Sequence, residues 1–225
     1  MSSSKFCPCC ENTGVNFDQA GKCSVCASNY RHRLAWLYMQ KEVKPKKSMN
    51  MLYFSPDKFI VKKIKEWFPG TCKTTDYYRP KKTDYGINME DIREIKDNKI
   101  DFILALNVLE FVKDDIKGMG ELCRILKPRG LFLTVIDINE GRSVEVEKDM
   151  KIRKNSRGFR ETTEEYDAEE RPRYAKRKYG LDVKDKLENA GFRVSIFSYG
   201  LSENIADFVK YDLRSEDRVV CCSKP

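Results

Sequence analysis

Four cysteines near the N-terminus have the spacing of a metal site. Cys7 and Cys10 form one C-x2-C pair, and Cys23 and Cys26 form a second pair twelve residues later. Two such pairs allow four thiolates to converge on Zn²⁺, whose binding energy can fold a segment that is too small for a core. The spacing predicts a structural zinc ribbon over residues 1–30, with Cys9 as a spare thiol. The alternative is a disordered tail with free thiols. A closed four-thiolate site has no open position for a substrate, so this zinc is assigned no catalysis.

Polar residues that end two apolar runs form the second candidate site. Residues 100–109 and 131–138 suit buried parallel strands, and the apolar residues between them have helical spacing. In open α/β sheets, ligands bind beyond the carboxyl ends of the strands. The sequence therefore places Asn107, Glu110 and Asp137 where chemistry can occur.

The remaining elements extend this unit into a doubly wound α/β domain. Strands are predicted at residues 49–54, 71–76, 84–87, 192–197 and 218–222, and helices at 60–68 and 181–190. Together with the central unit they predict a mostly parallel, seven-stranded sheet over residues 49–225, which follows a connecting helix and linker over residues 31–48.

The connecting helix contains the single histidine of the chain, His32. A histidine can serve as an active-site base or as a metal ligand. The alternative, which sequence reasoning favours, is a packing residue near the start of the helix.

Three segments together resemble a known family: DFILALNVLEFV, the LKPRG turn, and KYGLDVKDKLENAGFRV. They are similar to the class I S-adenosylmethionine-dependent methyltransferases, and the likeness covers most of the chain from Met49 onward. The ribbon and its helix also resemble the N-terminal extension of a bacterial subgroup of these enzymes. The resemblance implies a Rossmann-like fold, transferase activity and S-adenosyl-L-methionine as cofactor.

The resemblance also implies the cofactor contacts. Asp76, at the end of a strand, matches the acid that binds the ribose, and Asn88 and Met89 match the pair that meets the adenine. The turn after the first strand, which in the family is rich in glycine, reads Tyr-Phe-Ser-Pro-Asp in this chain. The expected cofactor-binding residues are Phe54, Ser55, Asp57, Asp76, Asn88, Met89 and Asn107.

On the acceptor side, this chain departs from the zinc-bearing subgroup. Related sequences commonly have histidines where this chain has Asn107, Phe111 and Ala175, and a histidine is the usual base for a hydroxyl near neutral pH. The alternatives are a carboxylate base, a nucleophile that needs little deprotonation, recruitment of His32, or loss of catalysis. The catalytic candidates are therefore Asn107, Glu110 and His32.

A charged insertion over residues 139–178 follows the strand that ends at Asp137, and its position predicts a lid. Its basic end could hold an anionic or polyhydroxylated acceptor, and the alternative is a solvated charged face. The expected acceptor contacts are Asp137, Arg171, Arg173, Tyr174 and Arg177.

Composition restricts the remaining choices. The 225-residue chain carries 43 basic and 35 acidic residues, a net charge of +8, and nine cysteines. No apolar run is long enough to span a membrane, and the cysteine pattern suits a reducing compartment, so we expect a cytoplasmic protein. The predicted function is methyl transfer to a small-molecule or glycan-like acceptor, at oxygen. The alternatives are an RNA or DNA methyltransferase, or a vestigial fold that binds nucleic acid; the sequence does not indicate the oligomeric state.

Overall fold

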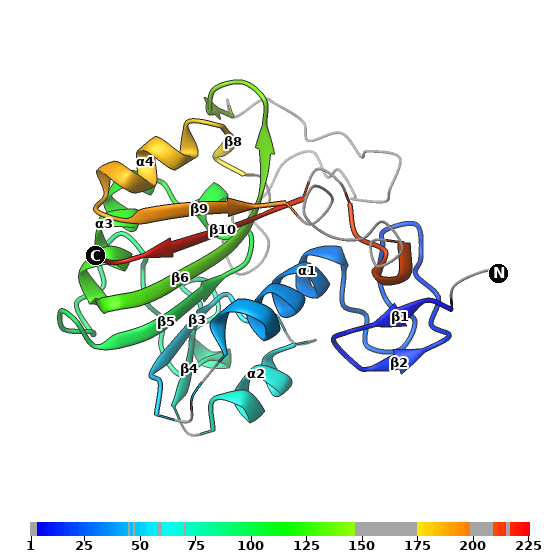
Figure 1. The fold of residues 1–225 in the computed structure, drawn as a ribbon. Coiled ribbons are helices and arrows are strands. Elements are labelled where there is room, and N and C mark those ends of the chain that lie inside the picture. Colours follow the sequence, from blue (N-terminus) through cyan, green and yellow to red (C-terminus); the bar gives the residue numbers. More distant parts are fainter. Residues whose placement is uncertain are drawn as a thin grey trace.

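The computed structural model describes residues 4–44, 46, 48–57, 60–69, 71–146, 175–198, 209–214 and 217–225. Its centre is a twisted sheet, drawn in Figure 1. In spatial order the main strands are β4 (Cys72–Thr75), β3 (Met51–Phe54), β5 (Ile100–Ala105), β6 (Leu126–Asn139), β10 (Asp217–Ser223) and β9 (Arg193–Phe197). The first four run parallel, and β10 runs antiparallel to both of its neighbours. The predicted doubly wound, mostly parallel sheet is confirmed.

Two details of the sheet differ from the prediction. Residues 84–87 form no strand and make a single bridge, between Thr75 and Tyr85. Side chains supply the other bonds to β4: Thr74 donates to the Asp84 carboxylate, and the Ile87 amide donates to the Thr75 hydroxyl. The two short strands β7 (Val144–Glu145) and β8 (Arg177–Gly180) add to the far end of β6, so the described sheet has eight strands where seven were expected. Both short strands lie in the segment predicted as a lid without strands. Residues 147–174 of that segment lie outside the described residues.

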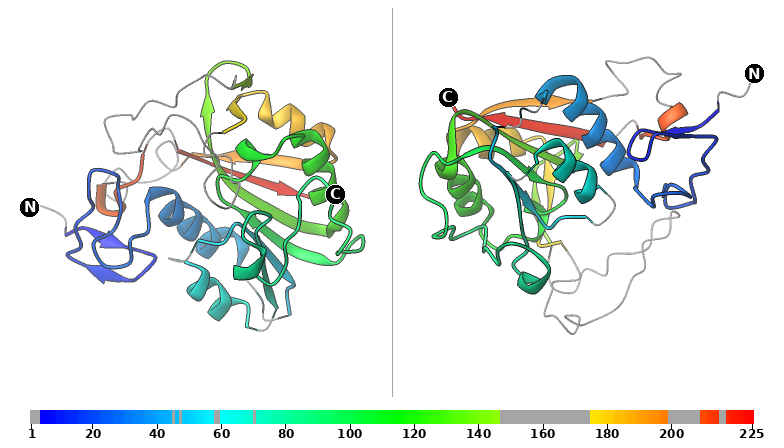
Figure 2. Two further views of the ribbon diagram at one scale, coloured as in Figure 1. Left: turned by 180° about the vertical axis from the view of Figure 1, so that it is seen from behind. Right: turned by 90° about the horizontal axis from the view of Figure 1, so that it is seen from below.

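Helices cover both faces of the sheet, as the two views of Figure 2 show. On one face lie α1 (Tyr30–Tyr38), which continues as a π-helical segment at Met39–Val43, and α2 (Val61–Trp67). On the other lie α3 (Asp115–Ile125) and α4 (Val183–Asn189). Short 3-10 helices occur at Pro80–Lys82 and Leu109–Phe111. No helix among the described residues is long and apolar enough to cross a membrane.

The alternation of side chains along each strand produces two separate cores. In β3, Leu52 and Phe54 face α3 and α4, whereas Met51 and Tyr53 face α1 and α2. All four side chains are buried. Full burial of a large apolar side chain stabilises the fold by about 1.5–3 kcal/mol. The strands are therefore fixed on both faces, and their carboxyl ends are held in register.

The N-terminal ribbon is built on a short hairpin of β1 (Phe6–Cys7) and β2 (Asn12–Thr13). It shares an apolar cluster with α1 and the sheet, which runs from Cys7 and Val15 through Leu34 to Tyr53. The buried guanidinium of Arg33 donates to the carbonyl oxygens of ribbon and C-terminal residues: Gly21, Ser28, Tyr211 and Asp212. The ribbon is therefore packed against the sheet domain through α1, and the boundary at residue 30 stays a prediction.

Candidate functional site

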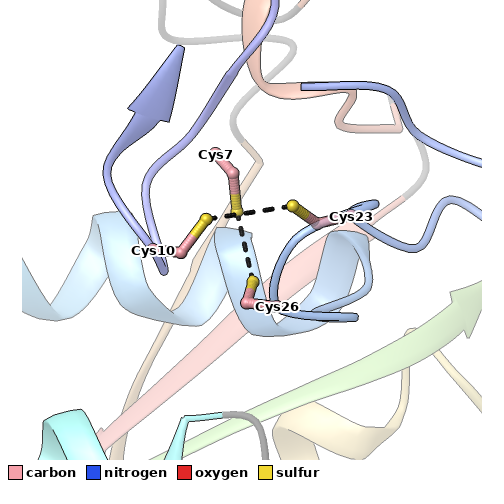
Figure 3. Close-up of side chains that lie close together, drawn as sticks. All are labelled: Cys7, Cys10, Cys23 and Cys26. Atoms are coloured by element: carbon pink, nitrogen blue, oxygen red, sulfur yellow. Dashed lines mark hydrogen bonds between the residues drawn. The ribbon is translucent and has the colours of Figure 1, made fainter. Parts of the chain in front are cut away.

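The four predicted zinc ligands converge in the ribbon. The sulfur atoms of Cys7, Cys10, Cys23 and Cys26 lie within 4.8 Å of one another (Figure 3). Cys7 and Cys26 are 3.7 Å apart, and Cys10 and Cys23 are 3.9 Å apart. A tetrahedral site with Zn–S bonds of about 2.3 Å separates its sulfur atoms by roughly 3.8 Å. The four thiols therefore fit one zinc ion, and Cys9 is not part of the cluster.

A cavity of about 290 Å³ opens at the carboxyl ends of β3 and β4. Five of the predicted cofactor residues line it: Phe54, Ser55, Asp76, Asn88 and Met89. Asp57 and Asn107 do not line this cavity. Asp57 contacts His32, and Asn107 donates to Glu110. The parallel register places all five at one edge because β3, β4 and the segment after Tyr85 end together.

The turn after β3 contains no glycine, but its backbone adopts a conformation that glycine favours. Ser55 has a φ of 47°, which lies in the left-handed region that non-glycine residues rarely adopt. The amide of Ser55 donates to the carbonyl oxygen of Thr75 at 2.7 Å, which fixes the turn. At the end of β5, Asn107 has a φ of 52°. Strain of this kind is concentrated at ligand sites.

The Asp76 carboxylate is buried and fully engaged. One oxygen accepts from the amides of Tyr78 and Arg79, at 3.0 and 2.9 Å. The other accepts from the Ser55 hydroxyl at 3.2 Å and from the Arg79 guanidinium at 2.9 and 2.6 Å. Asp76 thus has the predicted place at the end of β4, but an arginine of its own chain occupies it.

Several cavity residues were not predicted from the sequence. Tyr77 and Tyr78 follow Asp76, Phe111 and Lys113 follow β5, and Lys176 precedes β8. Tyr77 exposes 54% of its surface, although it is a large aromatic residue. An aromatic pair directly after a strand-ending acid was a readable signal. Lys176 belongs to the basic end of the charged insertion, which was expected over the site, but it was not among the expected contact residues.

A second polar cluster lies at the ends of β5 and β6. Asn107 donates through Nδ2 to Oε1 of Glu110 at 2.9 Å, and Glu110 is only 8% exposed. Its Oε2 has no hydrogen-bond partner among the described residues. Burial raises the pKa of Glu110 to about 7, although the charge of Arg31 and the Asn107 bond lower it. The Asp137 charge raises this pKa further, and Asp137 itself is paired with Arg31 through Nη2.

His32 lies at the start of α1 and contacts Asp57. The side-chain oxygen of Asn29 caps the helix by accepting from the backbone amide of His32. The backbone amide of Asn29 donates to His32 Nδ1 at 3.0 Å. Because Nδ1 accepts, the ring proton lies on Nε2, which faces Oδ2 of Asp57 at 2.7 Å. Both ring nitrogens are therefore engaged away from the four thiols, and this placement argues for a structural role.

The expected acceptor residues are only partly described. Arg171, Arg173 and Tyr174 lie outside the described residues. Arg177 is buried beneath the loop after β5: it donates to the carbonyl oxygens of Leu109, Val112 and Lys113, and to Glu145 at 3.0 Å. This geometry suits stabilisation of the loop rather than contact with an acceptor. Asp137 exposes 64% of its side chain at the open edge.

Comparisons with known proteins agree with this architecture. A family model described as "Methyltransferase domain" matches residues 73–134. An S-adenosylmethionine-dependent methyltransferase from Mesorhizobium loti superposes with a TM-score of 0.53 and 11% identity, over 84% of this chain and 97% of that one. A putative one from Listeria monocytogenes gives 0.51 and 13%, over 85% and 98%. A third from Aquifex aeolicus gives 0.50 and 14%, over 85% and 89%. None of the curated proteins matches the sequence.

The chain has the fold of the class I, S-adenosylmethionine-dependent methyltransferases. The predicted fold is confirmed. The match over residues 73–134 supports the predicted family and cofactor. The acceptor is not indicated by these comparisons.

The cavity fits S-adenosylmethionine, the cofactor that this fold implies. A buried acid at the end of β4 suits ribose hydroxyls, and the left-handed Ser55 lets the backbone approach a ligand closely. When bound, S-adenosylmethionine supplies an electrophilic methyl group. The chain itself would contribute the cavity residues that hold the nucleoside, and the neighbouring Asn107–Glu110 pair at the end of β5.

Proposed function

We propose that the chain transfers a methyl group from S-adenosylmethionine to a hydroxyl oxygen of a small-molecule or glycan-like acceptor, with Glu110 as the base. The observation that carries this proposal is the state of the Glu110 carboxylate. It is buried, one of its oxygens is without a described partner, and its pKa is raised to about 7. A general base works best when its pKa lies near the working pH.

The position of Glu110 supports this role. It follows β5, next to Val108 and Phe111, which line the cofactor cavity. Asn107 holds one carboxylate oxygen, and the second is buried without a hydrogen-bond partner among the described residues. A carboxylate with this pKa replaces the histidines that the subgroup commonly has here, so the proposal favours retained catalysis. Its proton would come from the acceptor hydroxyl during in-line transfer.

Asp137 is proposed to contact the acceptor. Its side chain is exposed at the end of β6 and pairs with Arg31. The charge of Arg31 also acts on Glu110. A carboxylate accepts hydrogen bonds from hydroxyl groups, which suits a polyhydroxylated molecule. Arg171, Arg173 and Tyr174 stay predicted acceptor contacts.

The test is methyl transfer from labelled S-adenosylmethionine to a panel of free sugars, nucleotide sugars and RNA. The Glu110→Gln variant should lose about 10²- to 10⁴-fold in turnover, the usual contribution of general base catalysis. Its affinity for S-adenosylhomocysteine should equal that of wild type. Glu188→Gln, on the exposed surface of α4, is the matched control.

Two results would contradict the proposal. Undiminished turnover of the same acceptor by Glu110→Gln would remove the base assignment. Methylation of RNA, with binding that weakens steeply as salt increases, would show that the acceptor class is wrong.

A further inference from the structure

Helix α1 brings two charged side chains to the carboxyl edge of the sheet. Arg31 and His32 lie in its first turn, just after the zinc ribbon. Arg31 pairs with Asp137 at the end of β6, and His32 contacts Asp57 in the turn after β3. These two strands end on either side of β5, which is followed by Asn107 and Glu110. The start of α1 therefore spans the edge at which the proposed chemistry occurs.

We propose that Arg31 is a positioning residue of the methyl-transfer site, supplied by the N-terminal segment, which fixes Asp137 and sets the charge at the edge that carries Glu110. The Arg31 side chain is 14% exposed and belongs to a helix that is buried against the sheet. A guanidinium held in this way is a fixed charge, unlike a surface arginine that moves freely in water. The inference rests on the proposed role of Glu110.

The electrostatics of the cluster support this role. The charges of Arg31 on α1 and of Asp137 on β6 both act on Glu110. The charge of Glu110 in turn contributes to the raised pKa of Tyr179 on β8, after burial and Asp115. Arg31 favours the ionised carboxylate, whereas Asp137 disfavours it. A nearby opposite charge lowers the pKa of a carboxyl because it favours the ionised form. Arg31 therefore opposes the effect of burial and keeps Glu110 in the range where a base is useful.

Two substitutions should act on Glu110 in opposite directions. Arg31→Gln removes a favourable charge, so the protonation midpoint of Glu110 should rise by about 1 pH unit. Asp137→Asn removes an unfavourable charge and releases Arg31, so the midpoint should fall. A purely structural role for Arg31 would give no such opposite pair.

The experiment is a pH titration of the full-length protein by NMR, with ¹³C label in the glutamate carboxyl carbons. The Glu110 signal is identified by its loss in Glu110→Gln. Arg31→Lys keeps the charge and should titrate close to wild type. Arg129→Gln removes an exposed charge at the other end of β6 and should leave the midpoint unchanged. Circular dichroism and S-adenosylhomocysteine binding check that each variant is folded.

The outcomes separate the two proposals. An ordinary midpoint near 4.3 for Glu110 in wild type would contradict the base assignment. A raised midpoint that moves in neither Arg31→Gln nor Asp137→Asn would overturn only the role of Arg31. If Arg31→Gln does not fold, Asp137→Asn decides, because a midpoint that stays in place or rises in that variant overturns the inference.

Discussion

The zinc ribbon and the carboxyl edge of the sheet are assembled in different ways. The ribbon depends on a few specific polar bonds: four sulfur atoms within 4.8 Å and one buried guanidinium that binds the backbone. The edge of the sheet depends on two apolar cores, which fix the strands and leave their ends free to carry polar residues. Substitution of a single cysteine ligand or of Arg33 should therefore destabilise the ribbon. Binding and catalysis at the carboxyl edge of the sheet should instead depend on side chains that come from elements far apart in the sequence.

Removal of the metal should have the largest effect and should be confined to one region. Cys10→Ser combined with Cys26→Ser should reduce bound zinc from about one ion per chain to almost none. The ribbon would lose the roughly 10–16 kcal/mol of binding free energy that folds such segments. Metal analysis gives the stoichiometry, and hydrogen exchange shows which amides open.

Cys9→Ala is the matched control, because Cys9 lies between two ligands but outside the sulfur cluster. It should retain zinc. If amide exchange in the double variant rises as much in strands β5 and β6 as in the ribbon, then the stability of the sheet also depends on the metal, and the contrast between the two regions is wrong.

Loss of the guanidinium that joins the two regions should rank second. Arg33 is fully buried and binds four carbonyl oxygens and the Asp212 carboxylate. Arg33→Met should lower the free energy of unfolding by about 3–5 kcal/mol, since the acceptors remain buried without a donor. Urea unfolding measures it.

Arg93→Met provides the comparison, because the Arg93 side chain is 85% exposed. It should change stability by less than about 0.5 kcal/mol. A similarly small loss in Arg33→Met would mean that the ribbon is held by its apolar contacts instead.

The same difference explains what the sequence could predict. Cysteine spacing identifies the ribbon, and apolar runs identify β5, β6 and α3, because these signals are local. Contacts between distant residues leave no such signal. Arg31 and Asp137 are 106 positions apart, and Arg177 is 68 positions from Leu109. Sequence reasoning placed Asp76, Asn88 and Met89 in the cavity through the family resemblance, but it offered no reason to expect Arg79 on Asp76.

On the sheet edge, loss of the Asp76 carboxylate should weaken cofactor binding. Asp76→Ala removes the acid expected to accept from the ribose, and hydrogen bonds to a charged group contribute about 1.5–3 kcal/mol. The affinity for S-adenosylhomocysteine should fall at least about tenfold. Calorimetry measures it, with Asp91→Ala as a surface control. Unchanged affinity would place the ribose elsewhere, and the ribbon should be unaffected in either case.

The smallest effect should come from Arg79, and it should have the opposite sign. Its guanidinium donates twice to the Asp76 oxygen that a ribose would need, at 2.9 and 2.6 Å, while its side chain is 31% exposed. A ribose bound to this oxygen would displace the guanidinium. The guanidinium is partly exposed while the carboxylate is buried, so we take the net contribution of the pair as no more than about 1 kcal/mol. Arg79→Gln should therefore tighten binding of S-adenosylhomocysteine, by at most about fivefold. Arg93→Gln breaks an exposed surface pair with Asp91 and should leave the affinity as it is. Weaker binding in Arg79→Gln would mean that the guanidinium orients Asp76 for the ribose. A local residue of the loop after β4 would then support cofactor binding at this edge.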